Sequence, residues 1–368
     1  MRKKKILFLI SDTGGGHRAS ANAVISALER MAPGRYDLKM VDFFNVGNSA
    51  VDGVIKGFYS RVIQRHRWVW GLTFSLTNNR VFWRAVQPLY RIIHDNIRMM
   101  IDKEKPDLVV SIHPMVNTIT KKVLDELGQG IPFLIITTDP VTLHVGWLER
   151  GADFTIVATE DAKKCLISLG VQEARVKVLG LPIAPDFYIP VRDKGVVKAR
   201  FGLRKDVFTV LFSGGGDGGG KIYPVVKRLI KDAAGERLDL QVIVVCGRNE
   251  KLRSKLASLG VIAIPFTDMM PELMGVVDLM VIKAGPGTIE ESMARGLPII
   301  ITSYLPGQEK ANIDYARKKW RAFYEPTVKG ATDRIKSEFR SPAKRHAPVK
   351  AGDAPVYRIA KFISSMLK

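Results

Sequence analysis

The chain has 368 residues, 46% hydrophobic and 25% charged, a balance typical of globular proteins that bury real cores and unlike that of disordered chains. Because domains cluster near roughly 100–150 residues, this length predicts two of them. Lys and Arg number 57 against 36 Asp and Glu, a formal net charge of +21 that favours an anionic partner: nucleic acid, an anionic membrane surface or a phosphorylated substrate.

The sequence indicates neither an oxidising compartment nor a membrane span. Cys165 and Cys246 lie far apart in apolar surroundings and lack metal-ligand spacing. The first apolar run ends at Ser11 and is too short for a signal peptide. Nothing approaches the ~18 consecutive apolar residues that suggest a spanning helix. We therefore expect a cytoplasmic protein.

Short apolar runs alternate with helical patterns over residues 1–180, which predicts βαβ units and a parallel sheet. A strand, a glycine-rich loop and a helix from about His17 to Met31 open this region. The predicted strands are 6–10, 37–42, 107–112, 133–137 and 154–157.

The same pattern restarts near Val207, again with a strand, a glycine loop and a helix. Residues 183–206 contain prolines and predict a linker. Residues 354–367 have helical apolar spacing and follow a polar connector. The predicted strands are 207–212, 241–245, 261–264, 278–282 and 298–302, and the predicted parts of the chain are 1–185, 186–340 and 341–368.

The first glycine loop, Ser11–Gly16, lies between a strand and a helix, where backbone N–H groups and the positive helix end face a ligand. Gly14-x-Gly16-x-x-Ala19 also fits the dinucleotide fingerprint, with Asp42 placed for a ribose hydroxyl, so an NAD(P)-dependent oxidoreductase is an alternative. A tight turn does not require the imidazole of His17, which is therefore a candidate functional group.

The second glycine loop, Gly214–Gly220, is followed by Lys221 and nearly fits a phosphate-binding P-loop. Ile222 stands where that motif needs a Mg²⁺-binding hydroxyl, which disfavours ATP hydrolysis. Gly215 and Gly216 remain candidates for cradling an anion.

A third motif runs from Lys283 through Gly285, Gly287 and Thr288. We expect Thr288 to cap a helix that offers N–H groups to phosphate. Glu290 and Glu291 are expected in the first turn of this helix, where its dipole favours acidic residues; alternatively, one of them holds a ribose diol. Polar residues at 305–312 crowd another helix start behind a strand, where open α/β sheets bind ligands.

Taken together, SDTGGGHRASA, KAGPGTIEES…GLP and PGQEKAN resemble glycosyltransferase family 28, most closely the monogalactosyldiacylglycerol synthases and bacterial diacylglycerol glucosyltransferases. The resemblance covers roughly residues 1–325. It implies an α/β GT-B fold: two Rossmann-like, doubly wound domains with an interdomain cleft. The first domain would bind the acceptor and the second the UDP-sugar, and helix 354–367 would cross back to the first.

The resemblance also implies roles for single residues. Glu291 matches the glutamate that grips the ribose, and Phe266-Thr267 matches the segment that meets uracil. Gln308 and Glu309 match the pair that reads sugar hydroxyls. The expected ligand-binding residues are Gly15, Gly16, Gly215, Gly216, Phe266, Thr267, Gly285, Gly287, Thr288, Glu291, Gln308 and Glu309.

The implied reaction is inverting transfer of a hexose, galactose favoured over glucose, from a UDP-sugar to the hydroxyl of diacylglycerol. An alcohol needs a base, and the resemblance makes His17 the candidate, with Asp12 sharing or replacing its role. His113 and Asp139 adjoin strands at the same sheet edge and could orient it. No Asp-x-Asp motif occurs, and glycine-loop amides can stabilise departing UDP, so we expect no metal and no cofactor besides the donor.

Residues 51–105 carry ten basic side chains against four acidic ones, interleaved with aromatic residues. This pattern predicts docking on an anionic membrane, which would place the enzyme peripherally on the inner face of the cell membrane. A solvated basic helix pair with a buried aromatic face is the alternative. A nucleic-acid partner is not expected because no recognised motif accompanies the charge. A UDP-sugar transferase with a non-lipid acceptor remains a further alternative.

Overall fold

The computed structural model describes residues 2–11, 15–43, 77–78, 91–342 and 349–367. Asp12 and most of the basic segment 51–105 lie outside these ranges, so the predictions made for them stay predictions. The chain divides into two compact units. The first comprises Met1–Pro185, Pro306–Gln308 and Gly352–Lys368, and the second comprises Asp186–Leu305 and Glu309–Ala351.

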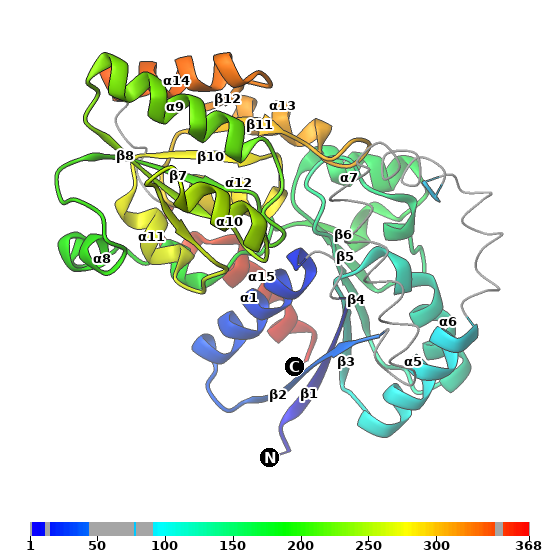
Figure 1. Cartoon of the computed structure of the whole chain (residues 1–368). Coiled ribbons are helices and arrows are strands. Elements are labelled where there is room, and N and C mark those ends of the chain that lie inside the picture. The colour runs from blue at the N-terminus through cyan, green and yellow to red at the C-terminus, as the bar shows by residue number, and fades with distance from the viewer. Residues whose placement is uncertain (1, 12–14, 44–76, 79–90, 343–348, 368) are drawn as a thin grey trace. The chain divides into compact units, whose positions relative to one another are not determined.

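The described strands of the first unit form a six-stranded parallel sheet in the order β2-β1-β3-β4-β5-β6 (Figure 1). The order reverses direction at β1, as in doubly wound folds, which bind ligands beside such a point at the carboxyl ends of the strands. The strands are β1 (Lys4–Ile10), β2 (Tyr36–Asp42), β3 (Leu108–Ser111), β4 (Phe133–Ile136), β5 (Phe154–Val157) and β6 (Val176–Val178).

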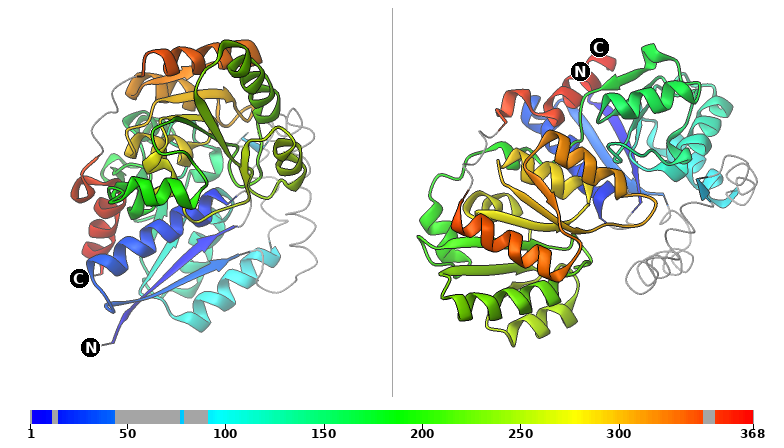
Figure 2. Two further views of the ribbon diagram at one scale, coloured as in Figure 1. Left: turned by 60° about the vertical axis from the view of Figure 1, so that its left-hand side comes forward. Right: turned by 90° about the horizontal axis from the view of Figure 1, so that it is seen from above.

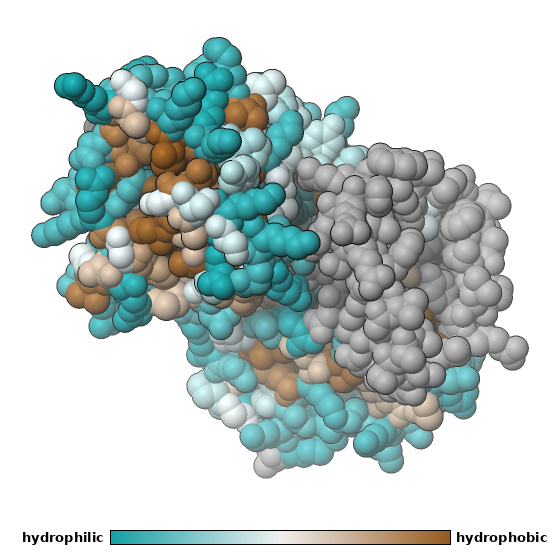
Figure 3. Space-filling view, in the orientation of Figure 1, coloured by the Kyte–Doolittle hydropathy of each residue, from teal (hydrophilic) through white to brown (hydrophobic). Residues whose placement is uncertain are grey.

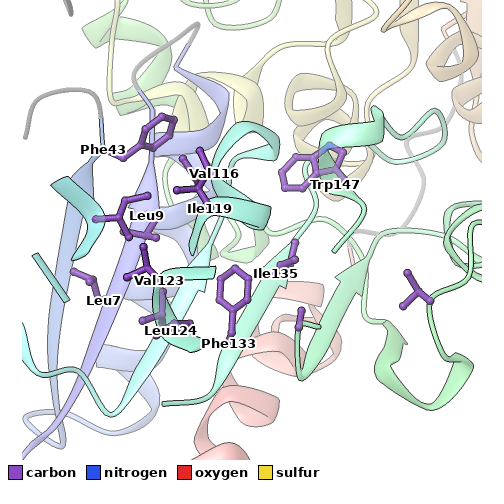
Figure 4. Close-up of a cluster of buried hydrophobic side chains, with 14 of the residues drawn as sticks. Leu7, Leu9, Phe43, Val116, Ile119, Val123, Leu124, Phe133, Ile135 and Trp147 are labelled. Carbon is purple, nitrogen blue, oxygen red and sulfur yellow. The ribbon is translucent and has the colours of Figure 1, made fainter. Parts of the chain in front are cut away.

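Helices α5 and α6 cover one face of this sheet. Alternate side chains of a strand point to the same face, so Leu7 and Leu9 share one cluster with Ile97 of α5 and Val123 of α6. Figure 4 shows the β1 and α6 members of this cluster, with Trp147 at its edge. The helices of the first unit are α1 (Gly16–Met31), α5 (Arg91–Glu104), η2 (Pro114–Val116), α6 (Asn117–Leu127), η3 (Val145–Trp147), α7 (Glu160–Ser168), η4 (Glu173–Arg175), η6 (Ala351–Asp353) and α15 (Pro355–Met366).

The C-terminal helix α15 packs against α1 within the first unit, red beside blue in Figures 1 and 2. Its apolar face, Val356, Ile359, Ala360 and Ile363, is fully buried. The Tyr36 hydroxyl lies 2.9 Å from Ser364 Oγ. The helical spacing seen in the sequence therefore corresponds to a helix whose apolar stripe completes the core of the first unit.

The second unit contains another parallel sheet, whose described strands run in the order β12-β11-β10-β7-β8-β9. Strand order again reverses direction, here at β7 and β10, so a second ligand-binding edge is expected at their carboxyl ends. The strands are β7 (Phe208–Ser213), β8 (Leu240–Val245), β9 (Ile262–Ile264), β10 (Leu279–Lys283), β11 (Ile299–Ser303) and β12 (Ala322–Tyr324).

Helices α9 and α14 lie together on one face of this sheet, where Val226 and Ile335 share a core cluster with Val210 and Val244 (Figure 2). This is the helix-covered arrangement that βαβ units produce. The helices of the second unit are η5 (Pro185–Tyr188, at the unit boundary), α8 (Lys194–Arg200), α9 (Ile222–Glu236), α10 (Glu250–Ala257), α11 (Met270–Val276), α12 (Pro286–Ala294), α13 (Lys310–Lys319) and α14 (Val328–Arg340).

The structure differs from the sequence-based expectation in the linker and at the edges of both sheets. The predicted linker 183–206 contains helix α8, because Asp193 accepts a hydrogen bond from the Val196 N–H at 3.0 Å and caps it, while Val197 packs inward. The edge strands β6 and β12 were not predicted. Each has three residues, which is too short to show the alternation that reveals a strand.

Candidate active site

The first glycine loop leads directly into helix α1. Gly15 occupies its N-cap position with φ of 79°, in the left-handed region that glycine adopts without steric cost. Among the described residues no side chain caps the first turn of α1, whose N–H groups lie where the chain leaves the carboxyl end of β1. Gly16 is the first residue of the helix and His17 the second.

His17 is surrounded by groups from three other segments of the first unit. Its Nδ1 lies 3.2 Å from the Thr138 hydroxyl, and its ring centroid lies 4.4 Å from that of His113 in an edge-on arrangement. The Trp147 ring is 6.3 Å away. Burial lowers the pKa of His17 to about 4, and a hydrogen bond to the Ile112 backbone opposes this shift only in part. His17 is therefore neutral at physiological pH, mainly through burial.

Two further histidines accompany it. His113 accepts a hydrogen bond from the Met115 N–H through Nδ1 at 3.2 Å, which leaves the proton of its neutral ring on Nε2. Burial, with smaller contributions from His17 and His144, holds the pKa of His113 well below its usual range. His144 accepts from the Gly146 N–H at 3.0 Å, and burial lowers its pKa to about 4.

The predicted neighbours of His17 are only partly brought to it. His113 contacts it directly, whereas Asp139 Oδ2 accepts a hydrogen bond from Trp147 Nε1 at 2.7 Å and so holds the indole. Trp147 ends the short helix η3, which follows β4 in the chain, and His144 is the N-cap of this helix. Neither residue was predicted to be part of the site, because the sequence around them carries no motif. This edge of the first sheet combines uncharged imidazoles with an indole, surroundings in which a neutral hydroxyl group can lie beside a proton acceptor.

The second glycine loop folds tightly on itself and packs against the turn that contains Arg248. A Cβ at Gly214 would lie 2.2 Å from the Gly219 carbonyl oxygen, so only glycine fits there. The carbonyl groups of Gly214 and Gly216 accept backbone hydrogen bonds, from Gly219 and Arg248 respectively. Within the described part of the chain, no acceptor receives the N–H of Gly216 or Gly220. The loop therefore has donors left for a ligand, the property expected of an anion cradle.

The third motif begins its helix earlier than expected. Gly285 is the N-cap of α12 and Pro286 its first residue, so Thr288 lies inside the helix and the predicted threonine cap is wrong. Proline, whose ring presets the helical φ, fixes this start. Glu290 and Glu291 consequently fall in the second turn, not the first, and the helix dipole does not account for them.

The two glutamates have different surroundings. Glu290 accepts a hydrogen bond from the Tyr315 hydroxyl, which gives it a structural partner. The carboxyl group of Glu291 has no hydrogen bond or ion pair with any described residue, and burial raises its pKa to about 7. A shielded carboxylate without donors binds a ligand that supplies them, so the structure favours Glu291 for a ribose diol.

Phe266 and Thr267 follow β9. The Phe266 N–H donates to the Gly247 carbonyl at 3.1 Å, and Thr267 Oγ1 accepts from the Met269 N–H at 3.1 Å. The Phe266 ring is 62% exposed. Exposed apolar side chains are ordinary, and Figure 3 shows brown ones scattered among teal on one face. The Phe266 backbone bonds to Gly247, which packs against the second glycine loop, and this position keeps the segment a candidate for the predicted backbone contact with uracil.

Gln308 and Glu309, the pair predicted to bind the sugar hydroxyls, belong to different units. Gln308 groups with the first unit and Glu309 with the second. Glu309 is 3% exposed; its Oε1 forms an ion pair with Lys283, and its Oε2 accepts from the Leu305 N–H at 2.8 Å.

The described residues contain no cluster of His, Cys, Asp and Glu able to hold a metal ion. Likewise, no helix within the described ranges has the length and hydropathy needed to span a membrane.

Comparison with family profiles assigns both units. The profile of the monogalactosyldiacylglycerol (MGDG) synthases matches residues 17–183, and that of the glycosyltransferase family 28 C-terminal domain matches residues 209–317.

Solved structures agree on the fold. The UDP-GlcNAc 2-epimerase of Neisseria meningitidis, bound to UDP-GlcNAc, has a TM-score of 0.62 at 14% identity and covers 99% of each chain. MurG of Acinetobacter baumannii has a TM-score of 0.55 at 16% identity, covering 98% of this chain and 99% of that one. The predicted GT-B fold is thus confirmed, and profiles and fold together define a glycosyltransferase of family 28. The oxidoreductase alternative is set aside.

Sequence relatives narrow this class. MGDG synthase 1 of Arabidopsis thaliana, a chloroplastic protein, is 32% identical over 372 residues, covering 98% of this chain and 69% of that protein. Arabidopsis MGDG synthase 2 is 31% identical over 353 residues, covering 92% and 74%. A probable synthase of Glycine max is 33% identical, but this chain spans only 61% of its length. The chain belongs to the monogalactosyldiacylglycerol synthase family.

Proposed function

We propose that this protein transfers a hexose, galactose in preference to glucose, from a UDP-sugar to the hydroxyl group of diacylglycerol and inverts the anomeric configuration. The observation that carries the donor half is Glu291, an unpartnered carboxylate at the ligand-binding edge of the second sheet. The relatives, named for monogalactosyldiacylglycerol synthesis, support the acceptor and the sugar.

The nucleotide part of the donor site is built from the second unit. Glu291 accepts both ribose hydroxyls, and the backbone around Phe266 and Thr267 meets the uracil. The phosphates face the first turn of α12, with Gly285, Gly287 and Thr288, and the glycine loop around Gly215 and Gly216, in which the N–H of Gly216 has no acceptor among the described residues. Gln308 hydrogen-bonds the sugar hydroxyls and distinguishes epimers. The site needs no metal because these donors stabilise the leaving diphosphate.

The acceptor half uses the first unit. The acceptor oxygen bonds to C1 of the sugar, the bond from C1 to the β-phosphate oxygen breaks with its electron pair, and a base takes the hydroxyl proton. His17 is neutral and so able to accept a proton. Asp12, five residues earlier, shares or takes over this role.

We further propose that residues 51–105 hold the enzyme on an anionic membrane, on the inner face of the cell membrane, where diacylglycerol lies. Ten basic residues against four acidic ones support this docking. Each basic group near such a surface contributes about 1 kcal/mol.

The test is transfer of labelled sugar from UDP-galactose and from UDP-glucose, in the presence of a chelator, with diacylglycerol vesicles or a water-soluble alcohol as acceptor. The proposal expects a labelled lipid, more from UDP-galactose. Label transferred only to the soluble alcohol would favour the non-lipid alternative.

A further inference from the structure

Lys283 and Glu309 form an ion pair at the ligand-binding edge of the second sheet, and the function proposed above leaves Lys283 without a role. Lys283 is the last residue of β10, and Glu309 immediately precedes α13. Their side chains are 22% and 4% exposed. An ion pair this shielded loses more hydration than a surface pair, so it rarely persists for stability alone.

Glu309 has little capacity left for another ligand. One carboxylate oxygen meets the Lys283 ammonium, and the other accepts the Leu305 N–H at 2.8 Å. Lys283, in contrast, has three N–H donors, of which Glu309 takes one.

The lysine lies between the two loops of the proposed phosphate site. A Cβ built on Gly285 would be 3.1 Å from Lys283 Nζ, and one built on Gly215 would be 3.4 Å from Lys283 Cε. The ammonium group therefore reaches the start of α12, while its chain passes along the glycine loop that follows β7. Both loops present N–H groups, and Lys283 adds a full positive charge between them.

A second polar group at the same edge also lacks a partner. Ser303 ends β11 and pairs in register with Lys283. Its Oγ is buried and has no hydrogen-bond partner among the described residues, and a Cβ at Gly220 would lie 3.2 Å from it. Lysine ammonium, serine hydroxyl and the free N–H groups of Gly216 and Gly220 are all donors, which suits a ligand rich in acceptor oxygens.

We propose that Lys283 binds the diphosphate of the donor and that Glu309 is a positioning residue that fixes the lysine, not a reader of sugar hydroxyls. This inference rests on the proposed UDP-sugar site. When the bond from C1 to the β-phosphate oxygen breaks, its electron pair adds charge to UDP, and a fixed ammonium stabilises that charge without reorganising. The carboxylate keeps the local charge near neutral, so UDP is not bound too tightly to leave.

The test compares three single variants of the ion pair, Lys283→Gln, Lys283→Arg and Glu309→Gln, with a double variant that carries Lys283→Gln and Glu309→Gln together. Glu338→Gln is added as a control. Glu338 is the matched control: it is 3% exposed and accepts from Arg321 at 3.0 Å through each oxygen, on α14. Calorimetry measures the affinity for UDP and for uridine, and steady-state rates with UDP-galactose and UDP-glucose give kcat and KM. Melting temperatures report whether each variant folds.

Lys283→Gln should weaken UDP binding about 10- to 100-fold, the loss expected for a charge-assisted contact, and leave uridine binding unchanged. Lys283→Arg should keep most of the wild-type affinity for UDP. Glu309→Gln should bind UDP as well as or more tightly than the wild type, because a negative charge is removed, yet lose at least about tenfold in kcat with both sugars alike. The double variant should be no worse in kcat than Lys283→Gln alone. Glu338→Gln should match the wild type in both assays.

Unchanged UDP affinity in Lys283→Gln would remove the lysine from the site. A changed preference between UDP-galactose and UDP-glucose in Glu309→Gln, or additive losses in the double variant, would show that Glu309 acts on the sugar directly. A wild-type protein that binds no UDP would instead overturn the donor site itself, so the two failures are distinguishable.

Discussion

Binding of a UDP-sugar should strengthen as pH rises from 6 to 8, because Glu291 titrates within this interval. Burial raises the pKa of its carboxyl group to about 7, from an ordinary value of 4.5. The ribose hydroxyls donate to the ionised carboxylate, whereas the protonated group has lost one acceptor position. The ionised fraction is roughly 0.9 at pH 8 and roughly 0.1 at pH 6, so affinity should fall by up to about tenfold across the interval.

Calorimetry with UDP-galactose measures this directly, since its esterified phosphates carry no group that titrates near pH 7. The three buried histidines beside the first sheet do not interfere: the pKa values of His17 and His144 are lowered to about 4, and that of His113 is also depressed. Glu291→Gln should bind about 10- to 100-fold more weakly at pH 8, and its affinity should not change with pH. Glu290→Gln is the matched control and should keep the slope, because Glu290 pairs with Tyr315. A wild-type affinity independent of pH, or a slope lost in Glu290→Gln, would refute the reasoning.

Further predictions follow from the same contacts. In the ligand-free protein, the raised pKa of Glu291 in the folded state means that its ionisation opposes folding above pH 4.5. Glu291→Gln should therefore increase the melting temperature more at pH 8 than at pH 5, and an equal increase at both pH values would contradict this. His17→Ala should lower kcat about 10²- to 10⁴-fold with little change in UDP affinity, and any acid limb due to His17 should fall near pH 4; near-normal turnover would exclude it. Gln308→Ala should reduce the preference between UDP-galactose and UDP-glucose while UDP affinity is kept, and equal losses for UDP and UDP-sugar would argue against a sugar contact. Liposome binding should increase with anionic lipid and decrease with salt, and binding indifferent to lipid charge in flotation would contradict docking through residues 51–105.

The sequence reveals the architecture well, because parallel strands and glycine loops leave local signals. The run Ile6–Ile10 and the inner part of the second run, Thr209–Phe212, are buried on both faces, and both are mainly apolar. Helix α8 has weaker signals: it is short, and a single aspartate cap within a proline-containing segment begins it. The start of α12 was misplaced because Thr288 is a good capping residue, yet Pro286 begins the helix three residues earlier than a Thr288 cap would.

The site is less predictable, because its contacts join distant segments. Spacing alone could not choose between Glu290 and Glu291; Tyr315, 25 residues further on, occupies the first and leaves the second open. Lys283 and Glu309 are 26 residues apart, and only the fold of the second sheet brings them together. A helix start favours a neutral histidine, as predicted for His17, but the depressed pKa of His17 arises mainly from burial, which its place in the sequence does not reveal.

The proposed reaction joins galactose to diacylglycerol with inversion. The most direct measurement is the structure of the lipid formed when the full chain, UDP-galactose and diacylglycerol vesicles are combined, with the anomeric configuration read by proton NMR. The expected product is a β-galactosyl diacylglycerol. The His17→Ala and Glu291→Gln variants should form it much more slowly than the wild type. An α-linked product, or no glycolipid from a protein that binds UDP, would contradict it.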